Sequence, residues 1–370
     1  MNKSSRDVMS FNGGIHPSGD GKSLSSGSPV QSAPLLDRYS VVLSENVGKV
    51  PTPVVKVGDE VKKNQLIAAA DGFVSANLHS PTSGKVIGIV EVPGVMGVPI
   101  PAIQIEADGN DEAIDPLDTL DWQVAPNSDL LRRIADCGVV GMGGAAFPTH
   151  VKLSPPSEKQ VDTLILNGAE CEPYLTADHR LMLEDPESVL TGAAISGKIL
   201  GVKSIYIGVE VNKIDAMEAL NRRAAEFGVQ VVGLKVQYPQ GSEKQLIKAI
   251  TDREVPAGGL PMDARCVVQN VGSAAAIADA VIRGIPLIER ITSVTGEVIK
   301  NPGNWRLKIG TPVIRAIEFA GGVTEEPGKL IMGGPMMGFA QKNFDVTICK
   351  NSSGVLLLPV SESVAYDAVG

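Results

Sequence analysis

The sequence is poor in residues that bind metals. Its four histidines form no HxH or HxxxH pair, so we predict no metal site and expect His150 and His179 to be hydrogen-bonded structural residues. No CxxC pair occurs either, which leaves no zinc or iron–sulfur motif. A disulfide framework is not expected at this length. We therefore predict buried, reduced thiols at all four cysteines, Cys137, Cys171, Cys266 and Cys349.

Long apolar runs and an excess of positive charge are also missing. Residues 86–105, the nearest to a membrane span, are interrupted by Glu91, glycines and prolines, which favours strands and turns. The N-terminus has no apolar segment typical of a signal peptide. A net charge of −9 argues against a nucleic-acid-binding protein, which needs a basic face. We expect a cytoplasmic protein, soluble or peripheral to a membrane.

Glycine (40) and proline (25) are plentiful, which favours turns and short strands. Residues 1–40 are polar, and we interpret them as an extended arm whose one distinctive piece is FNGGIHP. Residues 41–110 are β-rich and resemble a biotinyl/lipoyl-type barrel-sandwich hybrid, through VKVGDEVKKNQLIA and HSPTSGKVIGI. Carrier domains of that type present a lysine on a hairpin. The equivalent residues 72–77 contain none, so we predict a structural role.

Residues 125–284 alternate strands with helices, which predicts a Rossmann-like, mostly parallel sheet and a multi-domain α/β protein. We expect a helix that Asn127 caps and Gly138 ends. Further strands are expected at 163–166, 204–209 and 229–232, and further helices near 184–200, 212–227, 242–252 and 272–283. Residues 285–350 are interpreted as a β-grasp module, with a strand at 291–298, a turn at 301–304 and a helix at 311–320. Residues 351–370 are interpreted as a C-terminal strand and tail.

The segment 138–152 reads GVVGMGGAAFPTHVK. Glycines let backbone N–H groups approach an anion, and a helix that starts here would point its positive end at a phosphate. Lys152 would add a point charge. The spacing of Gly141, Gly143 and Ala146 matches the dinucleotide fingerprint formally, but a helix and not a full strand precedes it. A glycine-rich connection between helices is the alternative.

The segment NGAECEPY, residues 167–174, follows the strand at 163–166 directly. Ligands of open α/β sheets bind at the C-terminal ends of strands. Asn167 offers a donor and an acceptor, Glu170 and Glu172 accept from ribose or nicotinamide groups, and Tyr174 can stack on a ring. A plain acidic surface loop is the alternative.

Two further segments lie where a helix begins. Gly241 and Ser242 open a helix after Tyr238, and QNVG at 269–272 joins a strand to a helix. Both are candidates for anion-binding helix ends. Simple capping is the alternative for each.

Together these segments resemble the RnfC (RsxC) family, a component of the Rnf electron transport complex. The resemblance rests on FNGGIHP, GVVGMGGAAFPTHVKL, DTLILNGAECEPYLTADHRLMLE, YPQGSEKQLI, VVQNVGSAAAIADAV and GGPMMG. The glycine-rich and NGAECEP segments are also similar to the NADH-binding flavoprotein subunit of complex I. That family carries FMN on a loop of type GRGGAGFPTG and has an NxDExEPG segment nearby.

The resemblance implies binding sites for FMN and NADH. The FMN phosphate and ribityl chain would lie against the backbone of Gly141, Gly143, Gly144 and Ala145 and against Lys152. Flavin and nicotinamide ribose groups would be held by Asn167, Glu170 and Glu172. Phe147 would form a wall against the ring system, and Asn270 would lie at the flavin edge. The related Tyr–Gly–Glu–Glu loop corresponds to Tyr238, Gly241 and Glu243, with Ser242 replacing the first glutamate.

The resemblance also implies that NADH passes a hydride to FMN and that electrons continue to iron–sulfur centres and ferredoxin. No catalytic acid or base is expected, because hydride transfer breaks no O–H or N–H bond. The implied partners are the membrane and ferredoxin-like subunits of an ion-translocating complex, on the cytoplasmic side of the bacterial inner membrane. The family continues into two cysteine clusters that hold two 4Fe–4S centres, and these cysteines are absent from residues 1–370.

Two other functions stay open. The chain could be a non-catalytic scaffold whose modules bind partner subunits. It could instead provide a quinone site, similar to NqrA of the sodium-pumping quinone reductase. The intact GGAAFPT and GAECEP segments favour the flavin interpretation over the quinone site.

Overall fold

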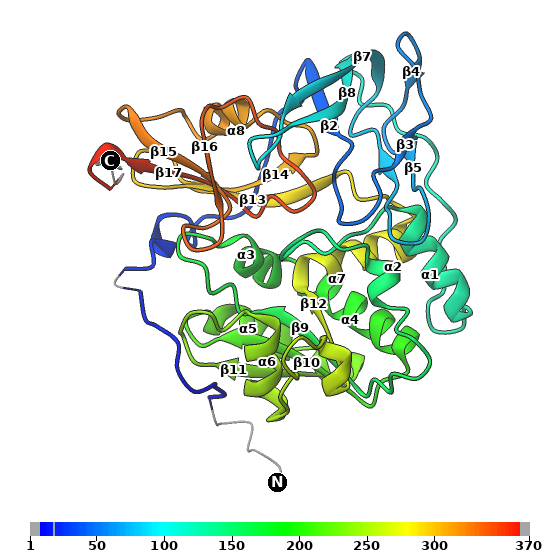
Figure 1. The fold of residues 1–370 in the computed structure, drawn as a ribbon, viewed down its shortest axis with the longest axis vertical. Helices are drawn as coiled ribbons and strands as arrows, with labels where there is room; N and C mark the ends of the chain where they lie inside the picture. The colour runs from blue at the N-terminus through cyan, green and yellow to red at the C-terminus, as the bar shows by residue number, and fades with distance from the viewer. Residues whose placement is uncertain (1–7, 18, 363–370) are drawn as a thin grey trace.

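The computed structural model describes residues 8–17 and 19–362, so the first residues of the predicted arm and residues 363–370 of the predicted tail lie outside the described residues. Figure 1 shows an α/β unit in green and yellow below a β-sandwich in blue and cyan and a second β-unit in orange and red. The described part of the arm runs along the side of the α/β unit up to the orange and red unit (Figure 1).

The α/β unit is built on a parallel sheet with the strand order β11-β10-β9-β12. In β9 the side chains of Leu164 and Leu166 belong to one apolar cluster and that of Ile165 to another. This alternation is what a strand buried on both faces requires. The strands are β9 (Thr163–Gly168), β10 (Ser204–Glu210), β11 (Val229–Leu234) and β12 (Cys266–Asn270).

Helices cover both faces of this sheet. One face packs on α3 (Ala177–Glu184), α4 (Pro186–Leu200), α5 (Ile214–Asn221) and α7 (Val271–Ala278). The other face packs on α6 (Glu243–Thr251) and the short turn η3 (Pro261–Ala264). A third cluster joins α4 and α7 to α1 (Asn127–Asp136) and to residues 139–153, which include the four-residue α2 (Thr149–Lys152). The predicted Rossmann-like layers are confirmed.

The blue and cyan unit is a small sandwich of two sheets around one apolar core. Its larger sheet has the order β2-β8-β7-β4: Arg38–Val42, Pro99–Ala107, Gly84–Pro93 and Glu60–Val61. Its smaller sheet has the order β3-β5-β6: Thr52–Pro53, Leu66–Ala69 and Leu78–His79.

The hairpin of the sandwich where a carrier would hold its lysine is docked on the α/β unit. The Nε2 atom of His150 in α2 lies 3.0 Å from the carbonyl oxygen of Phe73, and the two rings meet edge to face at 5.9 Å. Asn77 Nδ2 donates to the carbonyl of Asp136 at 3.1 Å. These contacts hold the hairpin in place, as a structural role requires.

The orange and red unit is a six-stranded mixed sheet with the order β1-β14-β13-β17-β15-β16. Helix α8 (Val313–Phe319) packs on it. The strands are β1 (Gln31–Ser32), β13 (Glu289–Thr295), β14 (Gly303–Lys308), β15 (Pro327–Met332), β16 (Phe339–Gln341) and β17 (Gly354–Pro359). The C-terminal strand β17 therefore lies inside this sheet, between β13 and β15, and β1 comes from the arm.

The arm is extended but closely packed. Met9 forms a bridge with Leu234 at the end of β11, and Ile15 forms one with Tyr238. A single 3-10 turn, η1 (Lys22–Leu24), then leads toward β1. The arm thus links the α/β sheet to the six-stranded sheet.

Several expected elements differ in detail. Asn127 is the first residue of α1, not its cap, and its side chain donates to the carbonyls of Lys198 and Ile199 at the end of α4. The expected helix at 212–227 ends at Asn221 and is followed by a separate turn, η2 (Ala224–Phe227), while the one at 272–283 ends in a π-turn, η4 (Asp279–Arg283). The strand at 291–298 stops at Thr295, because Gly296 has a φ of 118°.

Candidate functional site

The candidate site lies where the order of the parallel strands reverses. Chain order runs outward from β9 to β10 and β11, and then returns to β12 on the other side of β9. Open α/β sheets bind ligands at such a switch point, outside the C-terminal ends of the strands. Asn270 is the last residue of β12, Asn167 is the last but one of β9, and the two are direct register partners. Both predicted residues therefore stand at the same point of the sheet edge.

Residues 138–147, here called the glycine loop, cross this edge between α1 and α2. Gly143, Gly144 and Ala145 are exposed. Among the residues that the structure describes, none accepts a hydrogen bond from the N–H groups of these three. Ala146 takes a left-handed conformation with φ 55°, unusual for a residue with a side chain. The loop offers a row of unpaired N–H donors, as an anion site requires.

Four carbonyl groups of the glycine loop, those of Gly138, Met142, Gly144 and Ala146, are bound from outside the α/β unit. Arg290 of β13 donates to the carbonyl of Met142 at 3.3 Å, and Asn351 donates to that of Gly144 at 3.1 Å. Since the C=O and N–H of a trans peptide point in opposite directions, the N–H groups of Gly143 and Ala145 point away from these donors. Lys350 Nζ, buried, donates to the carbonyl of Gly138 at 2.7 Å, and the N–H of Val47 donates to that of Ala146 at 3.3 Å.

Arg290 and Lys350 are cations removed from water. Burial lowers the pKa of Arg290 to about 10, although the carboxylates of Asp178 and Glu170 act in the opposite direction. Burial also lowers the pKa of Lys350, while its buried partner Glu45 acts to raise it. Arg290 remains a cation at neutral pH, so a positive charge lies behind the glycine loop.

Asn270 is the residue against which the glycine loop packs. A Cβ added to Gly143 would come within 2.9 Å of Asn270 Nδ2, so only glycine fits there. The Asn270 amide donates to Asp178 Oδ2 at 2.7 Å and caps α7 by accepting from the N–H of Gly272 at 2.8 Å. The pKa of Asp178 is raised to about 6, because it is buried and faces Glu170.

Residues 167–175, here called the acidic loop, meet the 238–241 segment at the same edge. Asn167 Nδ2 donates to the carbonyl of Gly241 at 2.7 Å, and the N–H of Gly241 donates to Cys171 Sγ at 3.2 Å. Burial raises the pKa of Cys171 to about 11, so this half-buried thiol is neutral at physiological pH. The predicted residues Asn167 and Gly241 are thus in contact.

Glu170 faces inward. Its two carboxylate oxygens accept from the N–H groups of Asp178 and His179 at 2.7 and 3.2 Å, at the start of α3. A carboxylate is favoured there because the N-terminus of a helix carries partial positive charge. The backbone of Glu170 has a φ of 47°. Both oxygens are engaged by α3, which makes Glu170 a support of the acidic loop.

Glu172 lies between two units of the molecule. Its Oε2 accepts from the N–H of Met336 in the GGPMMG segment at 3.0 Å, and the hydroxyl of Tyr238 lies 3.5 Å from Oε1. Burial raises the pKa of Glu172, against the effect of these donors. Burial and the nearby Glu172 raise the pKa of Tyr238 to about 12. Glu172 and Tyr238, both predicted, form one pair.

Lys152 and Glu243 also come together, but as an ion pair. Lys152 Nζ lies 2.8 Å from Glu243 Oε1 and donates to the carbonyl of Val268 at 3.0 Å. The predicted helix after the glycine loop is only α2, four residues long, so its dipole is small.

The ring of Tyr174 packs on other parts of the chain, while the role expected of Phe147, a wall against the ring system, stays a prediction. The hydroxyl of Tyr174 donates to Glu297 of the six-stranded unit, and its ring packs on Gly21 of the arm and on the cluster around Leu356. Phe147 is half-buried, and its carbonyl accepts from the N–H of Gly141 at 2.8 Å. Tyr174 therefore joins the acidic loop to its neighbours.

Sequence reasoning missed three residues of this site: Lys22, Asp178 and Arg290. No local pattern marks Asp178, which reaches Asn270 across 92 residues of sequence. An arginine in a strand buried over Ile291 to Thr295 was the available signal for Arg290. Nothing local marks Lys22 in a polar arm.

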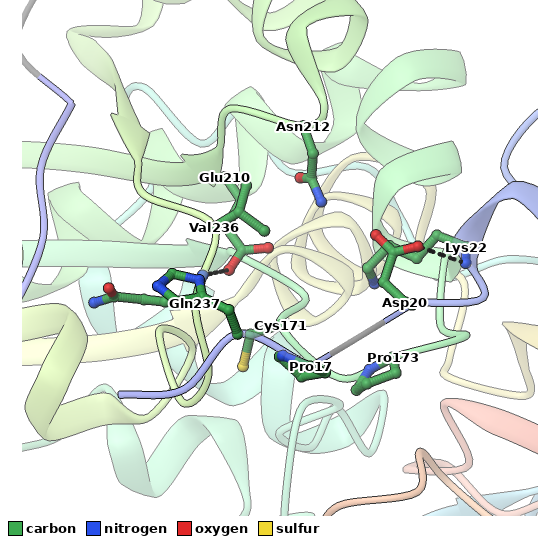
Figure 2. A pocket seen from close by; sticks show the side chains of 11 residues that line it. Pro17, Asp20, Lys22, Cys171, Pro173, Glu210, Asn212, Val236 and Gln237 are labelled. Atoms are coloured by element: carbon green, nitrogen blue, oxygen red, sulfur yellow. Dashed lines mark hydrogen bonds between the residues drawn. The ribbon is translucent and has the colours of Figure 1, made fainter. Parts of the chain in front are cut away.

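A cavity of about 340 Å³ lies beside the acidic loop, between the arm and the C-terminal ends of β10 and β11 (Figure 2). Its walls include Asp20 and Lys22 of the arm, Cys171 and Pro173 of the acidic loop, and Glu210. Glu210 is buried beside Lys213, whose Nζ donates to the carbonyl of Ala169 at 2.7 Å.

The predicted structural histidines are observed, but the prediction of four buried thiols is wrong at Cys171, which is only half-buried. His150 contacts Phe73, and His179 Nε2 lies 2.8 Å from Asp215 Oδ1. All four cysteines are free, and three of them are buried. In the part of the chain that the structure describes, no three His, Cys, Asp or Glu side chains are grouped to hold a metal ion. The same residues contain no helix long and apolar enough to cross a membrane.

Each of the three units matches the model of a known domain family. Residues 9–110 match the RnfC barrel sandwich hybrid domain, residues 134–279 the Nuo51 FMN-binding domain and residues 291–340 the SLBB domain. Among solved structures, an NAD+-reducing NiFe-hydrogenase in the H2-reduced state matches 65% of this chain and 49% of that chain, with a TM-score of 0.52 and 19% identity. At that identity the likeness concerns the fold alone.

Curated relatives match nearly the whole chain. The C subunit of the proton-translocating ferredoxin:NAD(+) oxidoreductase complex of Clostridium ljungdahlii is 51% identical over 94% of this chain and 76% of its own length. Its Na(+)-translocating counterpart from Acetobacterium woodii is 44% identical, over 94% and 79%. The corresponding protein of the ion-translocating oxidoreductase complex of Rhodobacter capsulatus is 43% identical, over 96% and 69%. The chain therefore belongs to the RnfC family of ion-translocating oxidoreductase complexes.

Proposed function

We propose that the chain binds FMN and NADH at the switch point and positions them for hydride transfer. The observation that carries the proposal is the row of unpaired N–H groups at Gly143, Gly144 and Ala145. Bound there, FMN supplies the chemistry that turns a two-electron hydride donor into a source of single electrons. The fit is supported by the open space over Gly144, where no atom lies within 4 Å of an added Cβ.

In this proposal the glycine loop binds the FMN phosphate through its N–H groups. The cation of Arg290 lies behind the loop, where its charge favours an anion on the open side. Asn270 holds Gly143 at the strand end and keeps the loop next to β12. Lys152, already paired with Glu243, contributes less than a free cation would.

The acidic loop is proposed to orient the flavin and the nicotinamide. Asn167 fixes the 238–241 segment at Gly241, and Glu172 presents a half-buried carboxylate beside the Tyr238 hydroxyl. A carboxylate and a phenol in one pair provide both an acceptor and a donor for ribose or amide groups. No residue is required to move a proton, because the hydride carries both electrons.

We propose further that the chain works in a membrane-associated, ion-translocating Rnf complex. Relatives at 51 and 44% identity are named as subunits of ferredoxin:NAD(+) oxidoreductase complexes. Residues 1–370 contain no CxxC motif, so the iron–sulfur centres and ferredoxin that receive the electrons lie outside these residues. Attachment to the membrane would come through partner subunits, on the cytoplasmic side where NADH is available.

The test is FMN binding by the purified chain, followed by anaerobic addition of NADH while the visible absorbance of the flavin is recorded. Loss of that absorbance would support a working hydride-transfer site. Bound flavin that does not respond to NADH would limit the proposal to cofactor binding. A chain that binds no FMN, even in excess, would contradict the proposal and favour a scaffold or a quinone site.

A further inference from the structure

One lysine of the N-terminal arm is buried against the acidic loop. Lys22 is only 8% exposed. Its Nζ donates to the carbonyls of Glu170, Glu172 and Leu175 at 2.9, 2.8 and 2.6 Å. An ammonium has three N–H donors, so the acidic loop uses all of them. The backbone of the loop is therefore folded around one cation from a distant part of the sequence.

Neighbouring arm residues follow the acidic loop closely. The N–H of Tyr174 donates to the carbonyl of Asp20 at 2.5 Å, and the hydroxyls of Ser25 and Thr176 are 2.7 Å apart. A Cβ added to Gly21 would lie 2.3 Å from the ring of Tyr174. The arm and the loop are thus fitted to each other along their backbones.

The arm forms one wall of the cavity beside the acidic loop. Figure 2 shows Asp20 and Lys22 on one side and Cys171 and Pro173 below them, with Glu210 across the cavity. Without the arm, this cavity would lack one wall, and the carbonyls that Lys22 binds would lose this donor. Unpaired buried carbonyls are costly, so the loop would rearrange.

We propose that Lys22 is a positioning residue that holds the acidic loop, and with it Glu172, in the conformation that binds the nicotinamide. The inference rests on the proposed function for the identity of the ligand. The arm is then part of the substrate site. The glycine loop is bound by Arg290 and Lys350 instead, so Lys22 affects the nicotinamide side and leaves the flavin phosphate side in place.

The direct test is hydrogen exchange of the cofactor-free chain. Lys22→Met removes the ammonium and keeps the rest of the side-chain length. It should speed exchange of the hydrogen-bonded amides of Ala169, Tyr174 and Thr176 by about tenfold or more. The matched control is Lys203→Met. Lys203 is exposed and directly precedes β10, so its substitution should leave the exchange of these amides unchanged. Unchanged exchange in a folded Lys22→Met chain would overturn the inference.

The second readout uses the loaded protein. Lys22→Met should raise the KM for NADH by about tenfold while the dissociation constant of FMN changes less than about threefold. Equal weakening of both would contradict the separation of roles. A wild-type chain that binds no FMN would contradict the proposed function only, because the exchange result does not depend on flavin.

Ser25→Ala covers the case in which Lys22→Met does not fold. It removes only the hydroxyl contact with Thr176. Faster exchange confined to the acidic loop and the start of α3, by about threefold, is expected. Exchange equal to wild type at these amides would overturn the inference.

Discussion

The glycine loop and the acidic loop lie at the same sheet edge, and buried cations bind the carbonyl groups of both. Behind the glycine loop the cations are Arg290 and Lys350, from the six-stranded unit and the segment next to it. Behind the acidic loop they are Lys22 of the arm and Lys213 of the α/β unit. Each loop is therefore shaped by a different part of the chain.

The loops differ in what they present to a ligand. With its carbonyls turned inward, the glycine loop offers unpaired N–H groups, which suit an anion. The acidic loop offers side chains, and of its two carboxylates only Glu172 lies beside a hydroxyl that a ligand could share. The comparison shows that the flanking units determine which backbone groups of the α/β unit are available.

Removal of the cation behind the glycine loop should have the largest effect. Arg290→Met removes the donor to the carbonyl of Met142. It also removes the positive charge that offsets the repulsion between Asp178 and Glu170. We expect a loss of about 3–5 kcal/mol in unfolding free energy and about 100-fold in FMN affinity. Urea unfolding and FMN titration measure the two.

Arg306→Met is the matched control for Arg290→Met. Arg306 is exposed on the adjacent strand β14 and lies 3.5 Å from Glu289. It should change stability by less than about 1 kcal/mol. Similar losses in both variants would mean that the buried position of Arg290 has no special importance.

Asp178 interacts with residues next to both loops. It faces Glu170 of the acidic loop and accepts a hydrogen bond from Asn270, on which the glycine loop packs. Its folded-state pKa of about 6 lies above the unfolded value near 3.9. Its contribution to stability is therefore full below about pH 4 and is lost as the pH rises through 6. Asp178→Asn removes this dependence, so the stability of the variant relative to wild type should increase by about 2 kcal/mol between pH 4 and pH 7.

Unfolding titrations at several pH values measure this difference directly. Glu172→Gln is a second variant for the same titration. Because burial also raises the pKa of Glu172, its stability relative to wild type should likewise increase as the pH rises. If the difference in unfolding free energy between Asp178→Asn and wild type does not change with pH, the pKa of Asp178 is not raised in the folded chain, and the account of its burial beside Glu170 is wrong.

Gly143 and Gly144 are neighbours in the glycine loop, but their surroundings differ. An added Cβ at Gly143 meets Asn270, while one at Gly144 meets nothing within 4 Å. Gly143→Ala should lower the stability of the cofactor-free chain by about 1–3 kcal/mol, because its Cβ meets Asn270. Gly144→Ala should leave that stability unchanged and weaken FMN binding by about tenfold, because its Cβ fills the space proposed for FMN. Fluorescence titration of FMN compares them. FMN binding by Gly144→Ala equal to that of wild type would place the flavin away from this loop.

The smallest effect is expected at the docked hairpin of the sandwich. Phe73 is 63% exposed, and its ring meets only the edge of His150 among the aromatic contacts. Phe73→Ala should lower stability by about 0.5–1 kcal/mol and leave FMN affinity unchanged. Thermal unfolding measures the first. A large loss of affinity would mean that the sandwich shapes the glycine loop as strongly as Arg290 does.

The sequence predicted what depends on local pattern. The continuous apolar run at residues 164–166 and the position of Asn167 directly after it placed the acidic loop at the end of β9. Family-specific segments indicated the three units. The partners of charged side chains were not predictable in this way. Lys22 reaches Leu175 across 153 residues, and Lys152 pairs with Glu243 across 91. Asn127 resembled a cap, but tertiary contact with α4 decided its role.

The central claim is that the N–H groups of the glycine loop receive the FMN phosphate. Its most direct test is residue-resolved amide exchange, by NMR, at Gly143, Gly144 and Ala145 with and without saturating FMN. These amides are exposed and unpaired in the chain alone, so the account predicts fast exchange that FMN slows at all three. Bound FMN that leaves their exchange unchanged would contradict it.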